Sequence, residues 1–269
     1  MSKPMFLAMI VAGALLGVLS AGCGGASGSS DPVVAQVGRA SITESTLNHR
    51  VAAFVRSDFY AVNVSKAPPG LATDPPDYAS CVRAAKTLAP PASSGKRIFT
   101  AAQLERRCHS LYTYVRQEAL SDLIYGLWAV GQDAEIGKHV SDQAVQQDLG
   151  ELVKKHYKTQ QAFATYLANA GWSLADMHYN VKRSLLAQQL AADSEAKARK
   201  LGGGEQALVK VILQRNVKWT NKTNCRAGYV VSQCKEYKAT PASTTPIESS
   251  PAVIFEEMNG GRYVQASSR

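Results

Sequence analysis

Apolar side chains recur at helical spacing over a long stretch in the middle of the chain. The stripe consists of Leu104, Cys108, Leu111, Val115, Ala119, Leu123 and Leu127, which lie on one face of a helix. Directly before it, Thr100-Ala101-Ala102-Gln103 has the spacing of a capping box, in which two side chains satisfy free backbone groups of the first turn. A long helix with one apolar face must pack against other elements, which predicts a mainly helical fold.

Further helices are predicted downstream of this stripe. Three residues that are typical helix N-caps each precede an apolar repeat, and they are Ser141, Thr159 and Ser173. Gly171 separates the second of these helices from the third, and Gly202-Gly203-Gly204 precedes a final apolar repeat over residues 208–219. No Lys-Ser or Lys-Thr follows the three glycines, so they do not form a phosphate-binding loop.

One strand is predicted before the helices. Val33-Val34-Ala35-Gln36-Val37 is a short apolar run that ends at Gly38. Ser41-Ile42-Thr43-Glu44 then has the spacing of a capping box, followed by an apolar repeat that starts at Leu47. We therefore expect a mainly α fold with a short N-terminal strand and a C-terminal helix.

Two segments interrupt this pattern. Prolines over residues 63–99 forbid a long helix there, so we predict an irregular excursion, with short helical turns allowed over residues 78–88. Residues 239–269 are rich in Ser, Thr and Pro at their start and are predicted to be disordered. The predicted helical domain is residues 33–222 and includes the excursion, and a small disulfide loop, residues 223–238, separates this domain from the tail.

The N-terminus has the parts of an export signal. Lys3 precedes an apolar run that is too short to span a bilayer, and Ser20-Ala21-Gly22 stand directly before Cys23. This arrangement resembles a lipobox, although Leu19 is displaced by one residue from its usual place. We expect residues 1–22 to be a signal peptide, Cys23 to carry a lipid, and residues 23–32 to form a flexible tether. An ordinary signal peptide with an incidental cysteine is the alternative.

Composition and charge limit the possible partners. Hydrophobic residues make up 45% of the chain and the formal net charge is +9, which indicates a basic globular protein. The expected location is the extracytoplasmic face of the cell membrane, where nucleic acid is not available as a partner. A basic surface there favours anionic lipid headgroups and other polyanions, or serves solubility alone.

Four cysteines remain after Cys23, and an exported protein meets an oxidising compartment. They are Cys81, Cys108, Cys225 and Cys234. Three pairings are possible, and proximity along the chain favours Cys81 with Cys108 and Cys225 with Cys234. Zinc is the alternative, because Cys108-His109 offers two ligands, but the chain has no C-x-x-C and no paired histidines at helical spacing.

Sequence motifs for catalysis are missing. The chain contains no G-x-S-x-G, no H-E-x-x-H and no glycine fingerprint after a strand. His156 lies on the apolar face that begins after Ser141, so we expect it to be packed rather than to act as a base. We predict no catalytic residue, no cofactor and no metal site.

Two blocks of the sequence resemble a known family. Val34-Ala35-Gln36-Val37-Gly38, with Ile42-Thr43 and the helix from Glu44, resembles the opening of the SurA and PrsA type chaperone-foldases of bacterial envelopes. A second block runs from Phe163 through Gly171 and Ser173 to Leu190 and resembles the later helical pair of that family. Together the blocks span residues 33–190, and Val37 stands where the family has Asn.

The resemblance implies a chaperone module without its enzyme domain. Members of the family commonly carry a parvulin-type prolyl isomerase domain of about 100 residues, a usual domain size, between the helical block and the closing helix. Here only residues 191–206 lie between those two parts, which is too few for a domain. The resemblance therefore makes prolyl isomerase activity doubtful for this protein.

The implied activity is binding of unfolded exported polypeptides by exposed apolar and aromatic side chains. The candidate contacts are Phe54, Phe59, Tyr60, Tyr112, Tyr125 and Trp128, each of which is alternatively a core residue. Two other functions stay open. The first alternative is a lipid-anchored receptor that captures small solutes, and the second is a partner subunit of an intact isomerase.

Overall fold

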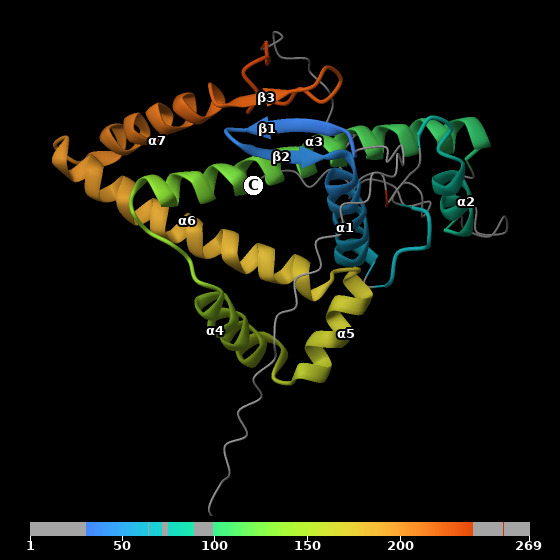
Figure 1. Cartoon of the computed structure of the whole chain (residues 1–269). Coiled ribbons are helices and arrows are strands. Elements are labelled where there is room, and N and C mark those ends of the chain that lie inside the picture. The colour runs from blue at the N-terminus through green and yellow to red at the C-terminus, as the bar shows by residue number, and fades with distance from the viewer. Residues whose placement is uncertain (1–30, 64, 72–74, 89–98, 239–254, 256–269) are drawn as a thin grey trace, which may run out of the picture. The chain divides into compact units, whose positions relative to one another are not determined.

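The computed structural model describes residues 31–63, 65–71, 75–88, 99–238 and 255. The predicted signal peptide and Cys23, the predicted lipid-attachment residue, lie outside these residues. Residues 31–269 form one compact unit, separate from residues 1–30. Every described helix and strand lies in that unit, so a chain that starts at Asp31 contains the whole described fold (Figure 1). The fold is mainly helical, as predicted.

A small antiparallel sheet joins residues 33–43, near the start of this unit, to residues 223–225. β1 (Val33–Val37) is the central strand, with β2 (Ala40–Thr43) on one side and β3 (Thr223–Cys225) on the other. Ala35 pairs with Ile42 in β2 and with Cys225 in β3. The predicted disulfide loop is therefore continuous with the sheet, because its first residues form β3.

The predicted capping box at Ser41 is wrong. Residues 40–43 form β2, because Gly38 adopts a positive φ of 59° and allows a two-residue turn that returns the chain alongside β1. Helix α1 (Glu44–Asn63) starts after this strand. A residue outside the helix caps a free backbone group of its first turn. The backbone N–H of Ser45 donates to the carboxylate of Asp31, 14 residues earlier, at 3.1 Å.

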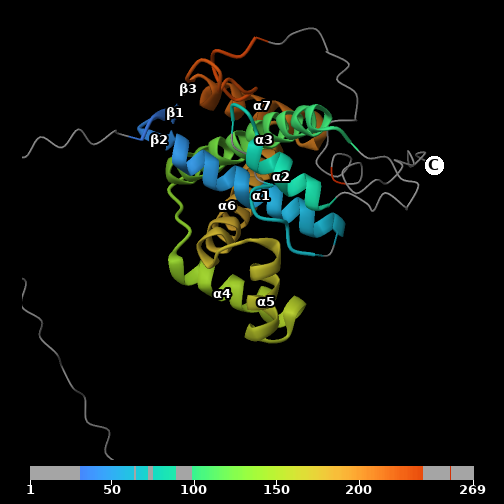
Figure 2. The ribbon, with the colours of Figure 1, turned by 90° about the vertical axis from the view of Figure 1, so that its right-hand side faces the viewer.

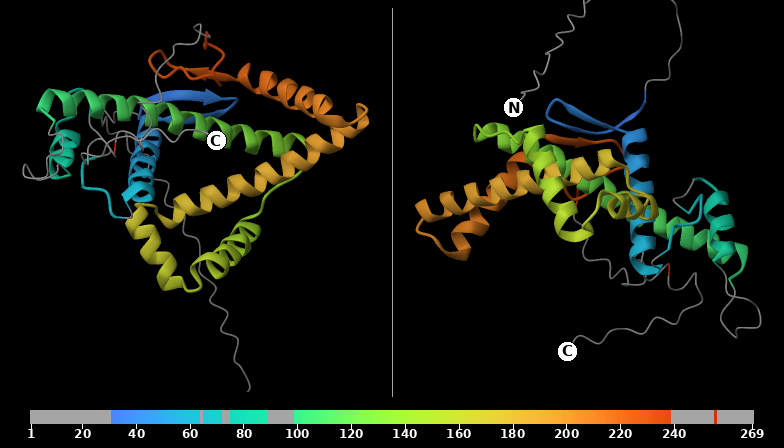
Figure 3. Two further views of the ribbon diagram at one scale, coloured as in Figure 1. Left: turned by 180° about the vertical axis from the view of Figure 1, so that it is seen from behind. Right: turned by 90° about the horizontal axis from the view of Figure 1, so that it is seen from below.

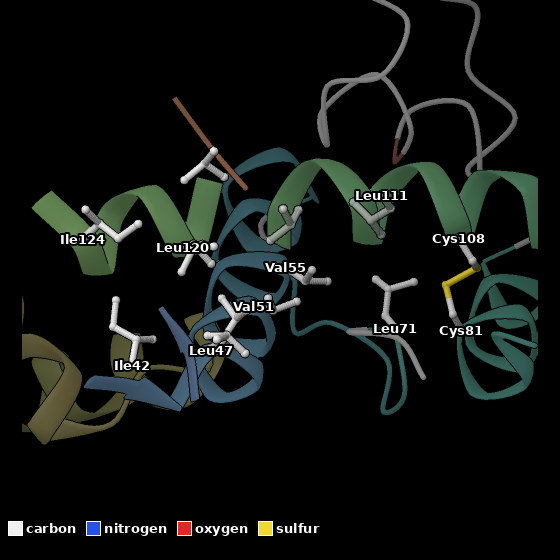
Figure 4. Close-up of a cluster of buried hydrophobic side chains, with 14 of the residues drawn as sticks. Ile42, Leu47, Val51, Val55, Leu71, Cys81, Cys108, Leu111, Leu120 and Ile124 are labelled. Atoms are coloured by element: carbon white, nitrogen blue, oxygen red, sulfur yellow. A yellow bond between two sulfur atoms is a disulfide. The ribbon is translucent and has the colours of Figure 1, made fainter. Parts of the chain in front are cut away.

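The main hydrophobic core lies between α1, the sheet and α3 (Ala101–Glu135). Figure 4 shows buried side chains of α1, among them Leu47, Val51 and Val55, beside Leu111, Leu120 and Ile124 of α3. The capping box that starts α3 is confirmed, with Thr100 and Gln103 each bonding to the backbone of the other.

Both disulfides form the pairs that proximity along the chain favours. Cys81 of α2 (Ala79–Thr87) bonds to Cys108 of α3 and attaches α2 to the long helix (Figure 4). Cys225 bonds to Cys234 just beyond β3. The four thiols are therefore consumed in disulfides, which contradicts the zinc alternative. Among the described residues no three His, Cys, Asp or Glu side chains cluster as metal ligands would.

A second core lies under α3 and is formed by the helices that follow it. They are α4 (Asp142–Leu152), the π-helix η2 (Val153–Tyr157), α5 (Gln160–Ala170) and α6 (Leu174–Lys200). The predicted caps Ser141, Thr159 and Ser173 are confirmed, since each hydroxyl accepts a backbone N–H of its helix. Figure 2 shows α4 and α5 below α6, on the side away from the sheet.

His156 is not packed in the core as predicted. The π-helix at residues 153–157 has one extra residue in its turn, which changes the phase of the helix after Val153. His156 is consequently exposed, and Tyr157 packs against Phe163 in its place, with ring centroids 5.1 Å apart.

A buried cation joins α1, α3 and α6. Arg50 of α1 is 3% exposed and forms an ion pair with Asp122 of α3 at 2.7 Å. Its other contacts are the amide oxygen of Asn180 at 2.8 Å and the ring faces of Phe54, Trp172 and Tyr179. Charge-assisted hydrogen bonds and cation–π contacts are stronger where water is excluded. Arg50 therefore fixes the relative positions of the three helices.

The last two helices form a hairpin. α6 ends at Lys200 and α7 (Gly204–Thr220) begins after a short turn in which Gly202, Gly203 and Gly204 all have positive φ. Figure 3 shows α6 and α7 converging at this turn, with the C-terminal half of α3 between them. α7 is loosely packed along its length, because only Val211 and Trp219 are buried.

One residue of the predicted disordered tail contributes to the core. Phe255 is fully buried and packs edge-on against Phe59, with ring centroids 5.3 Å apart. The rest of that tail lies outside the described residues. No helix that the structure describes combines the length and apolarity that a membrane crossing requires.

Candidate functional site

The walls of the candidate site are α3, α6 and α7, which enclose two open cavities. The volumes are about 520 Å³ and about 560 Å³. Gln132, Leu190 and Arg215 line both cavities and form the partition between them. We call the two cavities together the cleft, the first being the aromatic cavity and the second the charged cavity.

Large apolar side chains line the aromatic cavity. Tyr125 and Trp128 of α3 pack edge to face, with ring centroids 5.2 Å apart. The opposite wall is formed by Leu208 and Ile212 of α7. Exposed small residues of α6, Ala187 among them, lie at the rim of this cavity. The aromatic cavity therefore offers apolar surface that solvent can reach.

Hydrogen bonds to the start of β3 hold the Trp128 ring in place. The indole N–H of Trp128 donates to the hydroxyl of Thr223 at 2.8 Å. That hydroxyl donates in turn to the backbone carbonyl of Trp219 in α7, also at 2.8 Å. Because Thr223 is fully buried, this chain of bonds connects the wall of the cavity to the sheet.

Arg215 crosses the cleft from α7 to α6. Its guanidinium donates to the Ser194 hydroxyl at 2.8 Å and to the Leu190 carbonyl at 3.2 Å. Its Nε is buried and has no partner among the residues that the structure describes. Burial lowers the pKa of Arg215, and the negative charge of Asp193 opposes that shift. Arg215 is thus a cation with hydrogen-bonding capacity left over between two apolar walls.

Ion pairs surround the charged cavity. Glu135 of α3 accepts from Lys218 and Lys222, both at 2.8 Å, and these hydrogen bonds hold the pKa of its carboxyl below the usual range. On α6, Lys197 pairs with Asp193 at 2.8 Å. Apolar floor and charged rim together suit a ligand that has both apolar groups and a polar backbone.

Of the predicted contacts, the structure brings only Tyr125 and Trp128 together in the cleft. Tyr125 is 45% exposed, whereas Trp128 is 3% exposed and supports the ring of Tyr125. Phe59 is 1% exposed, because its ring packs against Phe255. The prediction that Phe59 is a client contact on the surface is therefore wrong.

The three other predicted contacts lie outside the cleft and are partly buried between elements. Phe54 packs on Trp172, and Tyr60 packs on Tyr166. Tyr112 packs beside Tyr78, which precedes α2. These aromatic pairs join α1 to α5 and to the turn that follows it, and the start of α2 to α3, so their first role is in packing.

The α6 and α7 walls of the cleft were not predicted from the sequence. The available signal was the composition of α7, in which apolar residues occupy more than one face. Leu208 and Ile212 face the aromatic cavity, and Val211 lines the charged cavity. A helix with more apolar faces than its neighbours can cover leaves apolar surface in contact with solvent.

A serine, a histidine and an aspartate meet at the start of α6 but do not form a catalytic relay. The Asp176 carboxylate accepts from the Ser173 hydroxyl at 2.6 Å and from His49 at 2.8 Å. Burial would raise the pKa of Asp176, but the bonds from Ser173 and His49 outweigh it and hold that pKa low. Because the serine donates to the aspartate rather than to the histidine, nothing activates it as a nucleophile.

Comparisons with known proteins add no identity. No protein-family model, no curated protein and no solved structure matches this chain. The resemblance to the SurA and PrsA type chaperone-foldases therefore stays a prediction from the sequence.

Proposed function

We propose that this protein binds unfolded exported polypeptides in the cleft between α3, α6 and α7, as a membrane-tethered chaperone without an isomerase domain. The observation that carries the proposal is the cleft itself, which keeps the aromatic side chain of Tyr125 and the aliphatic walls of α7 accessible. Apolar surface of this kind binds the apolar side chains that an unfolded chain exposes.

Polar groups in the cleft suit a polypeptide backbone. The half-buried guanidinium of Arg215 and the side-chain amide of Gln132 each line both cavities. An unfolded segment presents carbonyl oxygens between its side chains, and these accept hydrogen bonds from such donors. Shared apolar and polar contacts of this kind are weak individually, which allows a client to leave and fold.

The turn between α6 and α7 is short, which supports the proposal that this protein has no isomerase domain. The resemblance places such a domain between the helical block and the closing helix, where this chain has Leu201 and its three glycines. α6 and α7 consequently pack directly against each other. The two disulfides agree with an extracytoplasmic location, and the proposed anchor is a lipid on Cys23.

Aggregation of a chemically unfolded client, followed by light scattering, tests this proposal. The fragment that starts at Asp31 should suppress scattering at near-stoichiometric amounts. Ala187→Glu and Ala191→Glu place a charge at the mouth of the aromatic cavity without altering the core, because both alanines are exposed. Each should raise the amount needed for half suppression about tenfold, which corresponds to about 1.4 kcal/mol of binding free energy.

Ala192→Glu is the matched control, since Ala192 is exposed on the same helix but lines neither cavity. Equal suppression by the Ala187→Glu, Ala191→Glu and Ala192→Glu variants would rule out the cleft as the binding site. A parallel prolyl-peptide assay should give the uncatalysed rate, and acceleration would contradict the proposed lack of isomerase activity.

Capture of a small solute is the second candidate. The observation in its favour is the volume of each cavity, which lies in the range of about 300–1,000 Å³ that small ligands occupy. Native mass spectrometry of the purified fragment separates the two functions. A small molecule retained at unit stoichiometry, together with unchanged client scattering, would favour solute capture.

A further inference from the structure

α7 has a third face that points away from both cavities. Val209, Leu213 and Val217 are four residues apart and therefore align along one side of the helix. They are 46%, 57% and 61% exposed, among the most exposed large apolar side chains that the structure describes. We call these three residues the outer stripe. In Figure 1, α7 lies at an edge of the described fold rather than under another helix.

Positive charge is concentrated in the segment of the chain that contains the outer stripe. Residues 197–238 contain ten Lys and Arg against two Glu, a formal net charge of +8, while the whole chain has +9. Four carboxylates from outside this segment pair with it, and they are Glu44, Glu135, Asp193 and Glu195. Subtracting them still leaves +4 in this segment.

A lysine lies beside the outer stripe. Lys210 is three residues before Leu213 and is therefore its neighbour on the helix surface, whereas Lys218 lines the charged cavity. Both lysine side chains are exposed. Lys218 pairs with Glu135, whereas Lys210 forms no ion pair with any residue that the structure describes. Exposed apolar residues on one helix face with lysines beside them are typical of helices that lie in the interface of a membrane.

We propose that the outer stripe and its surrounding lysines and arginines dock α7 onto the surface of an anionic lipid bilayer. The valine and leucine side chains would enter the boundary between headgroups and acyl chains, and the basic side chains would contact the phosphates. α7 has 17 residues and a length of about 25 Å, so it would lie in the plane of the membrane surface.

Charge complementarity favours a bilayer over the other occupants of such a face. A second copy of this chain would bring the same positive charge to the contact, and like charges at an interface are repelled. An unfolded polypeptide has no fixed charge to match a cluster of +4. An anionic bilayer matches both the apolar stripe and the charge.

The described start of the chain lies near α7. Arg226, just after β3, donates its backbone N–H to the carbonyl of Val34 in β1 at 2.9 Å. β3 itself follows α7 after only Asn221 and Lys222. If Cys23 carries the proposed lipid, the ten residues from Cys23 to Val33 can separate that lipid from β1 by at most about 36 Å, which would keep the described start of the chain close to the membrane. Only this step depends on the proposed anchor.

Cosedimentation of the fragment that starts at Asp31 with lipid vesicles tests the proposal. The vesicles are phosphatidylcholine alone, or phosphatidylcholine mixed with phosphatidylglycerol, at low and high salt. We expect binding to the anionic vesicles at low salt, with loss of binding at high salt and on phosphatidylcholine alone. Equal binding to both kinds of vesicle would overturn the proposal.

Two pairs of variants locate the contact. Val209→Ser, Leu213→Ser and Val217→Ser combined should abolish binding, while Leu174→Ser, which changes a residue 52% exposed at the other end of α6, should not. Lys210→Glu should weaken binding about 25-fold, because it changes the charge by two and each charge contributes about fivefold. Lys154→Glu on η2 is its control and should bind as the parent does.

Unchanged vesicle binding by the triple serine variant would reject the outer stripe as the docking surface. If that variant instead converts a dimer to a monomer in sedimentation velocity, the occupant is a second copy. If it loses suppression of client scattering and keeps vesicle binding, the occupant is the client. Failure of the cleft shows separately, because Ala187→Glu acts in the scattering assay and leaves the outer stripe intact.

Discussion

Replacing Arg50 by Ala is expected to destabilise the whole fold, because this buried cation holds α1, α3 and α6 together. The change removes the bonds to Asp122 at 2.7 Å and 2.9 Å and the bond to Asn180 at 2.8 Å. It also leaves the Asp122 carboxylate, which is 9% exposed, with a single cationic partner, Arg183.

The magnitude follows from burial on both sides of the pair. Breaking a buried ion pair by removing one partner costs about 3–5 kcal/mol, and the remaining contact with Arg183 places Arg50→Ala near the lower end, about 3 kcal/mol. Arg183→Ala is the matched control. Its side chain is 42% exposed, so the loss of its contact with Asp122 should cost at most about 1 kcal/mol.

Urea unfolding of the fragment that starts at Asp31, followed by circular dichroism, measures these differences. A third variant, Arg50→Met with Asp122→Leu, removes both charges and should be more stable than Arg50→Ala, because no carboxylate is left buried. The reasoning would be refuted if Arg50→Ala lowered the free energy of unfolding no more than Arg183→Ala does.

Two further predictions concern packing and pH. Gly131→Ala should lower the free energy of unfolding by about 1–3 kcal/mol, since a Cβ there would lie 1.9 Å from the Trp219 ring. Gly150→Ala, where a Cβ would meet nothing, should not lower it, and equal losses in urea unfolding would argue against the packing of α3 on α7. Burial, with a smaller effect from Glu118, raises the pKa of Asp58 to about 6. Protonated Asp58 is therefore favoured in the folded state, so its contribution to stability is full below about pH 4 and is lost as the pH rises through about 6. Asp58→Asn should stabilise the protein relative to the parent increasingly over that range, and a constant difference between their melting temperatures across pH would contradict it.

Helix starts could be predicted from the sequence because their causes are local. Thr100, Ser141, Thr159 and Ser173 each bond to a backbone group within three residues. Gly171 ends α5 with a positive φ of 70°, which is also a local property. These elements needed no knowledge of the rest of the fold.

Strands β2 and β3 could not be predicted, because pairing with β1 is what makes them strands. Residues 41–44, most of which lie in β2, fit a capping box equally well, and residues 223–225 are too few to show a pattern. The π-helix had no sequence signal either, so His156 was assigned to the wrong face. Each of these errors comes from a contact or a phase change that depends on tertiary packing.

The cleft was predicted in part for the same reason. Tyr125 and Trp128 were among the expected contacts, but Phe59 has the same kind of helical spacing and is buried by Phe255, a residue far away in the sequence. Exposure of an aromatic residue is set by what covers it. The α7 wall was not predicted, because Leu208 and Ile212 lie beside a cavity only as a result of how few α7 residues the rest of the fold buries. That burial depends on tertiary packing.

If this chain is exported, as proposed, the pairing of β1 with β3 has a consequence for the order in which it can fold. β1 emerges among the first residues, whereas its partner Cys225 lies about 190 residues later. If export proceeds from the N-terminus, the central strand waits with one edge unpaired until nearly the whole chain has been translocated. The last step of folding is then the closing of the sheet, so a stalled or truncated chain would present a free strand edge to its neighbours.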